Sequence, residues 1–323
     1  MNSEIELSEI IEKISSSKRI VIFTHESPDG DAIGSSLAMY LSMKQLGKDV
    51  DVVCDKYSRV FEFLSSIGDI KSEVNGKYDL AICLDCASKE RLYDPNGVFD
   101  KCDYTVSLDH HASNTFYADS NYVEGKSPAA AQTVIKLLKK LDVTITKEIG
   151  ECLMVGIITD TGGFRYASVT NETFNFAADM YLLGVDISEI YLKVFMVQTK
   201  AQFLLSRIAN DRLEFFNKNR VAFTYVYMKD EKKVNADTGD HEGIVDIGRN
   251  IEGVEVSIFA REYEDGFKVS FRSNEYVDVA EIAKVFGGGG HCRAAGCVVN
   301  MPLEEFKNKV LKETYKALWM GYC

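Results

Sequence analysis

The sequence contains no apolar stretch that is long enough to cross a membrane. The longest candidates, such as residues 152–159, fall far short of the roughly 20 residues that a spanning helix needs. The first residues (MNSEIELSEIIEK) are acidic and helical in pattern, which is not typical of a signal or transit peptide. We therefore expect a cytoplasmic protein without a membrane partner.

Two further absences narrow the function. The cysteines include the close pairs Cys83/Cys86 and Cys292/Cys297, but no second cluster with matching spacing completes a zinc site. Basic residues are in deficit, with 37 Lys and Arg against 49 Asp and Glu and a net charge of −12. This deficit disfavours binding of long nucleic acid, which relies on basic surface, but local cations or metals still allow a small anionic ligand.

The pattern of the first half predicts an α/β fold. The chain has 323 residues, more than a single core usually holds, so we expect two domains. Short β-branched runs alternate with helical patterns, and this rhythm is typical of a doubly wound, mostly parallel sheet. The expected strands are residues 19–24, 50–54, 79–84 and 104–108, and the expected helices are residues 5–14, 32–46, 128–141 and 147–158.

The second half predicts a smaller α/β domain. Residues 188–215 have an amphipathic helical pattern without Gly or Pro, so we expect a helical connector there. Strands are expected at 220–227, 254–260 and 267–271, with Asp265-Gly266 as a hairpin turn, and helices at 278–286 and 303–318. The predicted organisation is one domain over residues 1–187, the connector over 188–215 and a second domain over 216–323.

Acidic and histidine residues collect where the predicted strands end. The carboxyl ends of the strands in a doubly wound sheet form one crevice, in which ligands bind, so we expect these side chains to meet. The residues concerned are His25, Asp29 and Asp31 in the segment HESPDGD, Asp85, the run Asp109-His110-His111, and Asp160 after an apolar helix.

Such a concentration of carboxylates predicts metal ions. Asp29, Asp31, Asp85 and Asp160 carry four negative charges when ionised, which two divalent ions would neutralise. Mixed His and Asp ligands suit Mn²⁺, Fe²⁺, Co²⁺ or Zn²⁺ better than Mg²⁺. Two such ions would activate a bridging water and bind the oxygens of a phosphoryl group. Each motif alone has a plainer explanation as a turn, a helix cap or a solvated pair, but their conjunction favours a two-metal site.

A glycine-rich run marks a second candidate site. The segment GGGGHCRAAG contains Gly287, Gly288, Gly289, Gly290 and His291, and it lacks the Gly-Lys-Ser/Thr ending of a phosphate-binding P-loop. Consecutive glycines can present backbone N–H groups to an anion, and the alternative is a flexible turn. Arg272 and Ser273, at the end of a predicted strand, could bind a phosphate or a base edge, and the alternative is a solvated strand end.

Together these motifs resemble those of the DHH phosphoesterase family. The first motif matches at His25, Asp29 and Asp31, and the others at Asp85, at Asp109-His110-His111 and at Asp160. The later FRS and GGGGHxxAAG segments are similar to the DHHA1 domain of that family. The likeness is greatest to compact members that hydrolyse very short RNA and convert 3′-phosphoadenosine 5′-phosphate (pAp) to AMP and phosphate. Close relatives of those members cleave cyclic di-AMP or pApA, and the motifs do not separate these substrates.

The resemblance implies a role for each matching position. One metal, which we expect to be Mn²⁺, would be bound by His25, Asp29 and Asp85, and a second by Asp31, Asp85, His110 and Asp160. His111 would act at the scissile phosphate, and Asp109 would orient its neighbours. The substrate, bound in a cleft between the two domains, would contact Arg165, Arg272, Ser273, Gly287, Gly288, Gly289, Gly290 and His291.

Several alternatives stay open at this point. A pyrophosphatase, or an exonuclease acting on long single strands, could use the same metal motifs. The FRS and GGGGH segments argue against the first, and the net charge of −12 argues against the second. A nucleotide sensor without turnover would be expected to lack a ligand, and no ligand position is missing. A homodimer is compatible with the sequence, which does not determine the oligomeric state.

Overall fold

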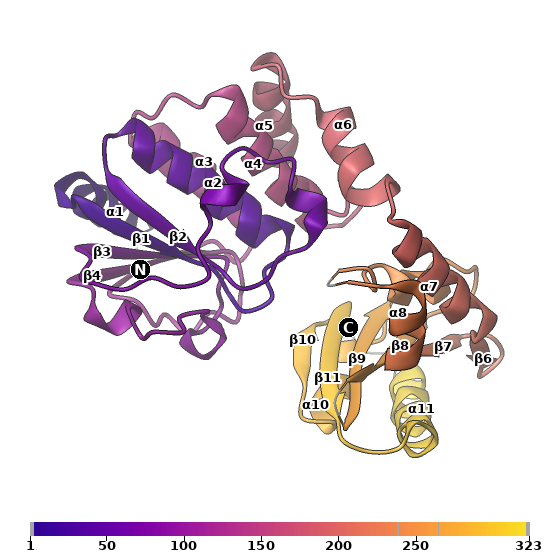
Figure 1. The fold of residues 1–323 in the computed structure, drawn as a ribbon. Coiled ribbons are helices and arrows are strands. Elements are labelled where there is room, and N and C mark those ends of the chain that lie inside the picture. Colours follow the sequence, from indigo (N-terminus) through magenta and orange to yellow (C-terminus); the bar gives the residue numbers. More distant parts are fainter. Residues whose placement is uncertain (1–2, 238, 264, 321–323) are drawn as a thin grey trace. The chain divides into compact units, whose positions relative to one another are not determined.

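The computed structural model describes residues 3–237, 239–263 and 265–320. The chain divides into two compact units, of which the first ends at Val197 and the second begins at Gln198. Each unit contains its own sheet and its own hydrophobic core (Figure 1). The two-unit α/β architecture that the sequence predicts is therefore confirmed.

The first unit is built on a sheet of five parallel strands in the order β2-β1-β3-β4-β5. The order shows that the chain adds β2 on one side of β1 and the later strands on the other. The ends of β1 and β3 therefore flank the switch point at which ligands bind in doubly wound sheets. The strands are β1 (Arg19–Phe23), β2 (Asp49–Val53), β3 (Leu80–Leu84), β4 (Tyr104–Asp109) and β5 (Ser120–Val123).

Helices cover one face of this sheet (Figure 1). Their apolar side chains, such as Leu37, Ile135 and Leu153, share a fully buried core with Ile20 and Ile82 from the strands. The opposite face is covered by connecting segments, which contribute Tyr78, Val98 and Phe99 to a smaller core. The helices of the unit are α1 (Ser3–Ser16), α2 (Gly30–Gln45), α3 (Ala130–Lys140), α4 (Lys147–Asp160), α5 (Asn171–Leu182) and α6 (Ile187–Tyr191).

Two glycines allow α2 and α4 to pack in close contact. A Cβ atom on Gly34 would lie 2.3 Å from the carbonyl oxygen of Cys152, and one on Gly156 would lie 2.5 Å from Oδ1 of Asp31. Real side chains do not tolerate such distances, so both positions need a residue without Cβ. This close approach brings the N-terminal end of α2 next to the C-terminal end of α4.

The second unit is a six-stranded mixed sheet in the order β10-β11-β9-β8-β7-β6. Among the described strands of this sheet, only β7 and β8 pair in parallel. β8 and β9 form the predicted hairpin, but Gly266, expected in its turn, is instead the first residue of β9 and pairs with Tyr263. The strands are β6 (Glu214–Phe216), β7 (Val221–Val226), β8 (Val256–Tyr263), β9 (Gly266–Ser273), β10 (Gly289–His291) and β11 (Ala294–Val299).

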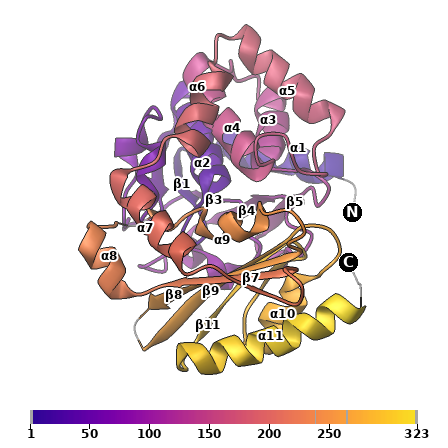
Figure 2. The ribbon, with the colours of Figure 1, turned by 90° about the vertical axis from the view of Figure 1, so that its right-hand side faces the viewer.

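Helices lie on both faces of the second sheet (Figure 2). Phe306 and Val310 of α11 pack with Phe271 on one face, whereas Leu205 of α7 and Ile244 of α9 pack with other core residues on the opposite face. The helices are α7 (Lys200–Asp211), α8 (Met228–Val234), α9 (Ile244–Arg249), α10 (Val279–Val285) and α11 (Leu303–Met320).

The segment 188–215, predicted as a helical connector, is not one continuous helix. The helix α6 runs into a π-helical turn at Leu192–Met196, and the backbone is then extended at Val197. A new helix, α7, starts after Thr199, whose hydroxyl accepts the N–H of Gln202 at 2.9 Å. The Thr199 cap satisfies a free N–H group at the start of α7. The amphipathic pattern contains no Gly or Pro at this point, so the sequence gives no sign that one helix ends and another begins.

The glycine run is only partly a turn, which was the alternative to an anion-binding segment. Gly289–His291 form the short edge strand β10, which pairs antiparallel with β11. Gly287 and Gly290 have positive φ values of 76° and 144°, which only glycine adopts readily. A Cβ on Gly288 would lie 2.1 Å from the carbonyl oxygen of Gly296, so this glycine is required for strand packing.

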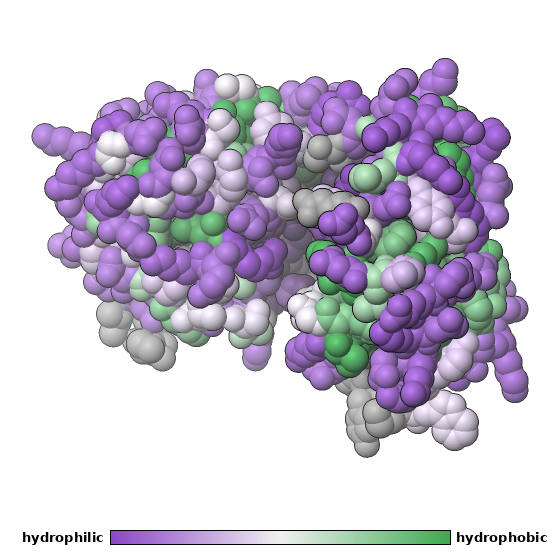
Figure 3. Space-filling model, turned by 60° about the horizontal axis from the view of Figure 1, so that its bottom comes forward, coloured by the Kyte–Doolittle hydropathy of each residue, from purple (hydrophilic) through white to green (hydrophobic). Residues whose placement is uncertain are grey.

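The surface is largely hydrophilic on the face drawn in Figure 3, where hydrophobic side chains occupy patches of limited size. In the described part of the chain, no helix combines the length and the apolar composition that crossing a bilayer requires.

Candidate metal centre

Side chains from five elements converge at the carboxyl edge of the first sheet. The segments that follow β1, β3 and β4 contribute His25, Asp85 and His110-His111, the start of α2 contributes Asp29 and Asp31, and the end of α4 contributes Asp160. In each of three groups, one ligand-type atom per residue lies within 4.8 Å of the others. The groups are His25/Asp29/Asp85, Asp31/His110/Asp160 and Asp85/His110/His111.

The β1–α2 segment places His25 and Asp29. His25 is buried, and its Nδ1 lies 2.8 Å from the carbonyl oxygen of Glu26, while Nε2 lies 3.8 Å from Oδ2 of Asp85. Asp29 is the N-cap of α2, where Oδ1 accepts the N–H groups of Asp31 and Ala32 at 3.0 and 3.1 Å. A capping carboxylate has a fixed orientation, so Asp29 is held in place before any ion binds.

Asp31 is fully buried in the first turn of α2. Its carboxylate accepts the N–H groups of Ala130 and of Ala131, the latter at 3.0 Å, and the hydroxyl of Ser35 at 3.0 Å. Asp31 therefore satisfies the free N–H groups at the start of another helix, α3. Burial, reinforced by the charge of Asp160, raises the pKa of Asp31 to about 7. A buried carboxylate with such a pKa needs a nearby cation in order to stay ionised at neutral pH.

Asp85 lies at the centre of the cluster. It follows β3 with a φ of 55°, an unusual left-handed conformation for a residue with a side chain. Burial, followed by the charge of Asp31, raises its pKa well above the ordinary value. Among the described residues, no group donates a hydrogen bond of normal geometry to the buried Oδ1, although Nε2 of His110 lies 3.3 Å away. An unsatisfied buried carboxylate oxygen is what a metal ligand is expected to show without its ion.

The ring of His110 is oriented so that Nε2 faces the carboxylates of the cluster. Its Nδ1 lies 3.1 Å from the carbonyl oxygen of Ser127, which must accept a proton from it. Its Nε2 lies 3.2 Å from Oδ2 of Asp160 and 3.9 Å from Oδ2 of Asp31. Burial alone would lower the pKa of His110, but contacts with Asp160 and Asp85 raise it to about 12. Loss of this Nε2 proton would let the same nitrogen bind a metal that replaces the positive charge.

His111 is held by Asp109, which is in turn hydrogen-bonded to the buried Asn114. Its Nδ1 lies 2.7 Å from Oδ1 of Asp109, and the other carboxylate oxygen accepts the side-chain N–H of Asn114 at 2.6 Å. Burial would raise the pKa of Asp109, but the hydrogen bonds of His111 and Asn114 hold it below its usual value. Asp109 thus contacts His111 directly, and its role in orienting His111 stays a prediction. Asn114 was not singled out in the sequence, although it lies only five residues after Asp109.

The chemistry of the donors fits divalent metal ions. Two of the three groups have no residue in common, and Asp85, which belongs to one of them, also lies 3.3 Å from His110 in the other. Burial raises the pKa values of Asp31, Asp85 and Asp160, which indicates that ionising all three without added positive charge is unfavourable. Carboxylates and imidazoles together are typical ligands of Mn²⁺, Fe²⁺ and Zn²⁺. The structure thus contains acidic and histidine groups that could bind metal.

The expected substrate contacts come from both units. Arg165 is exposed in the turn after α4, where its Nε donates to the carbonyl oxygen of Gly162 at 2.7 Å. Arg272 is half-buried near the end of β9 in the second unit, and His291 is exposed at the end of β10. Ser273 is buried, and its hydroxyl donates to the carbonyl oxygen of Val277 at 2.6 Å, which gives this side chain a structural partner.

Comparison with known proteins identifies both units. The model of the DHH family, N-terminal domain, matches residues 19–157, and the DHHA1 domain model matches residues 218–319. The bifunctional oligoribonuclease and PAP phosphatase NrnA of Thermus thermophilus is 32% identical, over 93% of this chain and 90% of that protein. The Bacillus subtilis protein of the same name is 23% identical, over 90% and 93%.

Solved structures show the same fold. An exopolyphosphatase-related protein from Bacteroides fragilis is 26% identical and superposes with a TM-score of 0.88, over 98% of this chain and 97% of that one. RecJ from Thermus thermophilus in complex with Mn²⁺ has a TM-score of 0.54 at 15% identity, over 98% of this chain and 55% of RecJ. The two matching domain models and a relative 32% identical over nearly the whole chain show that it belongs to the DHH family of phosphoesterases, with a DHHA1 domain in its second unit.

Proposed function

We propose that this protein hydrolyses short oligoribonucleotides to mononucleotides and pAp to AMP and phosphate, with two divalent metal ions, most simply Mn²⁺. The observation that carries the proposal is Asp85, whose buried Oδ1 has no hydrogen bond of normal geometry among the described residues and which adjoins both separate ligand groups. The names of the relatives support the substrate class, since those proteins are oligoribonucleases and PAP phosphatases.

The proposed ligands follow the two groups that have no residue in common. His25, Asp29 and Asp85 would bind one ion, and Asp31, His110 and Asp160, with Asp85 shared, would bind the other. Bound metals would supply Lewis acidity toward the phosphoryl oxygens and a hydroxide nucleophile at neutral pH. The protein contributes ligands whose orientation is fixed in advance by the cap at Asp29, the α3 contacts of Asp31 and the carbonyl partner of His110.

We assign proton delivery to His111. Its Nδ1 is engaged by Asp109, so the proton on that nitrogen stays in place and the ring is oriented by a buried carboxylate. In this orientation Nε2 is the atom that would give a proton to the leaving oxygen. The buried carboxylate of Asp109 lies next to the ring and would stabilise a positive charge on it.

Substrate binding is assigned to groups in both units. Arg165 and Arg272 carry guanidinium groups suited to phosphate oxygens, and His291 with Gly287, Gly288, Gly289 and Gly290 offers side-chain and backbone donors. The exposure of Arg165 and His291 supports this assignment. The Ser273 hydroxyl is hydrogen-bonded to Val277, so we expect Ser273 to act by stabilising the turn after β9 rather than by contacting substrate.

A parallel hydrolysis assay with Mn²⁺ tests the proposal. The substrates are pAp, RNA of two to five nucleotides, pApA, cyclic di-AMP, pyrophosphate and a long single strand, and the Asp85→Asn variant serves as the control for contaminating activity. We expect mononucleotides from the short RNA and phosphate from pAp. A clear preference for cyclic di-AMP or pApA would assign the same site to second-messenger breakdown. Absence of turnover on every substrate would refute the proposed function.

A further inference from the structure

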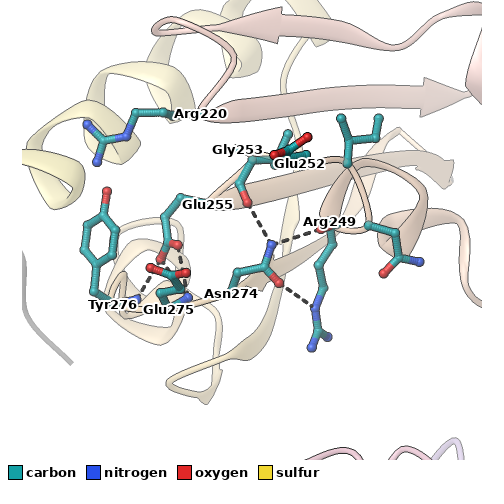
Figure 4. Close-up of a pocket in the computed structure, with 11 residues that line it drawn as sticks. Arg220, Arg249, Glu252, Gly253, Glu255, Asn274, Glu275 and Tyr276 are labelled. Atoms are coloured by element: carbon teal, nitrogen blue, oxygen red, sulfur yellow. Dashed lines mark hydrogen bonds between the residues drawn. The ribbon is translucent and has the colours of Figure 1, made fainter.

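A pocket of about 670 Å³ lies within the second unit, and none of the residues assigned above lines it (Figure 4). Its walls come from the turn before β7, the α9–β8 loop and the loop after β9. The volume is in the range of about 300–1,000 Å³ that small-molecule sites occupy. The lining is unusually polar for such a site, with arginine, glutamate, asparagine and tyrosine side chains, so a polar ligand is required to match it.

Hydrogen bonds of two side chains, Asn274 and Glu255, fix the walls of this pocket. The Asn274 amide donates to the carbonyl oxygens of Arg249 and Val254 at 2.9 and 2.7 Å, which ties the α9–β8 loop to the end of β9. The buried carboxylate of Glu255 accepts the N–H groups of Tyr276 and Val277 at 2.9 and 2.8 Å. The backbone around Tyr276 is therefore set in advance, which lowers the entropic cost of binding a ligand against its ring.

Arg220 and Tyr276 form a pair on one side of the pocket. The guanidinium carbon of Arg220 lies 5.6 Å from the centre of the Tyr276 ring, which is a cation–π distance. In the described part of the chain, no ion pair or hydrogen bond is found for the Arg220 guanidinium. Asn217, Lys218 and Asn219, directly before it, have φ values of 50°, 57° and 66°. Three successive left-handed residues are energetically unfavourable, and such strain is typically retained where it positions a functional group.

The opposite side supplies a second cation and acceptors. Arg249 lies across the pocket from Arg220 and Tyr276 (Figure 4), and its Nε donates to Oδ1 of Asn274 at 3.3 Å. The carboxylates of Glu252 and Glu275 are exposed at the rim. A bare phosphate would be repelled by these two carboxylates. A ligand with an anionic group and an amino-bearing planar group would match both kinds of charge.

We propose that this pocket binds a nucleoside monophosphate whose base carries an exocyclic amino group. The base stacks on Tyr276, its amino group donates to a rim carboxylate, and the phosphate binds a guanidinium of Arg220 or Arg249. A nucleotide contains all three features in one molecule of suitable size, and base–aromatic stacking is a common source of affinity for nucleotides. The choice of ligand class rests on the proposed function, because AMP is a product of both proposed reactions.

Equilibrium binding to the full chain tests this site. Calorimetry with AMP, adenosine, UMP and inorganic phosphate in EDTA removes turnover and metal-dependent binding. We expect AMP to bind more tightly than each of the others, and Tyr276→Ala and Arg220→Gln each to weaken AMP roughly tenfold or more. Tyr276→Phe should retain most of the affinity, because it keeps the ring. Tyr263→Ala, which removes a half-exposed tyrosine in the β8–β9 hairpin, is the matched control and should change nothing.

The outcomes separate this site from the metal centre. If AMP affinity is unchanged in both Tyr276→Ala and Arg220→Gln, with normal circular dichroism, the pocket proposal is wrong even when the protein hydrolyses pAp. If phosphate binds as tightly as AMP, the base is not recognised and the proposal is equally wrong. If AMP binding depends on Tyr276 in a protein that hydrolyses no substrate, the pocket stands and the proposed function fails.

Discussion

The side-chain N–H of Asn114 donates to Oδ2 of Asp109 at 2.6 Å, on the far side of the carboxylate from His111. Asn114 also donates to the carbonyl oxygen of Cys86 at 3.3 Å, in the residue that follows the left-handed Asp85. One buried amide thus connects the two loops that carry Asp85 and His111. Such a connection fixes both side chains relative to each other without touching the substrate.

Replacing Asn114 should therefore slow the reaction. We expect Asn114→Ala to lower kcat roughly 10–100-fold, the range observed when residues that support metal ligands are removed, while KM for pAp changes little. The control is Asn121→Ala, because Asn121 is a half-buried asparagine whose amide bonds to the backbone of Ala118. Steady-state kinetics in Mn²⁺ measures both constants. A normal kcat in Asn114→Ala would remove the positioning role.

Asp85→Asn should separate metal binding from folding. The substitution removes a buried carboxylate that is repelled by the charges of Asp31 and Asp29, so the metal-free protein should have a Tm equal to or above that of the wild type. The wild type should gain Tm on addition of Mn²⁺, because an ion that binds the folded state stabilises it. The variant should lose both that gain and hydrolysis. Calorimetry with and without EDTA measures the effect, and an undiminished Mn²⁺ shift would contradict the central role of Asp85.

Gly156→Ala tests the close packing of α2 and α4. The new Cβ would lie 2.5 Å from Oδ1 of Asp31 and 2.8 Å from Cβ of Ala131. Either α4 or the Asp31 side chain must therefore move. We expect a loss of about 1–3 kcal/mol of folding free energy, typical of overpacking, and weaker Mn²⁺ binding. Gly68→Ala is the control, because a Cβ at that position would meet no atom within 4 Å beyond its own chain neighbours. Urea denaturation measures stability, and an unchanged midpoint would show that the site relaxes freely.

Arg272→Ala tests the second unit. If its guanidinium binds a substrate phosphate, the variant should mainly raise KM for short RNA and pAp, with a smaller effect on kcat. Lys268→Ala is the matched control, since Lys268 lies four residues earlier on β9 and is exposed. If both variants have the same KM as the wild type, Arg272 has no part in binding substrate.

Much of the first unit follows from local patterns. Strand-forming runs and the position of Asp or His directly after them predict the parallel sheet, and the common edge of such a sheet brings those side chains together. The strand β5 (Ser120–Val123) and helix α5 were not predicted. The strand has only four residues and a polar composition, and its pairing with β4 depends on tertiary context.

Other features could not be read from the sequence because they depend on contacts between distant segments. Asn114 owes its role to a carboxylate and a carbonyl presented by two different loops. The pocket in the second unit combines residues from three loops, each of which is an ordinary surface segment by itself. The interruption before α7 depends on a threonine cap, and threonines of this kind are frequent in sequences without being caps.

Asp31 has a consequence beyond its proposed role as a metal ligand. Its carboxylate accepts the backbone N–H groups of Ala130 and Ala131, so an ion bound by this carboxylate would lie close to these two amide protons. In an NMR spectrum, the chemical shifts of these two amide protons should change when a diamagnetic ion binds the carboxylate. Their signals should broaden when the ion is the paramagnetic Mn²⁺. The start of α3 thereby carries a built-in spectroscopic reporter of metal occupancy, readable without substrate and without any added label.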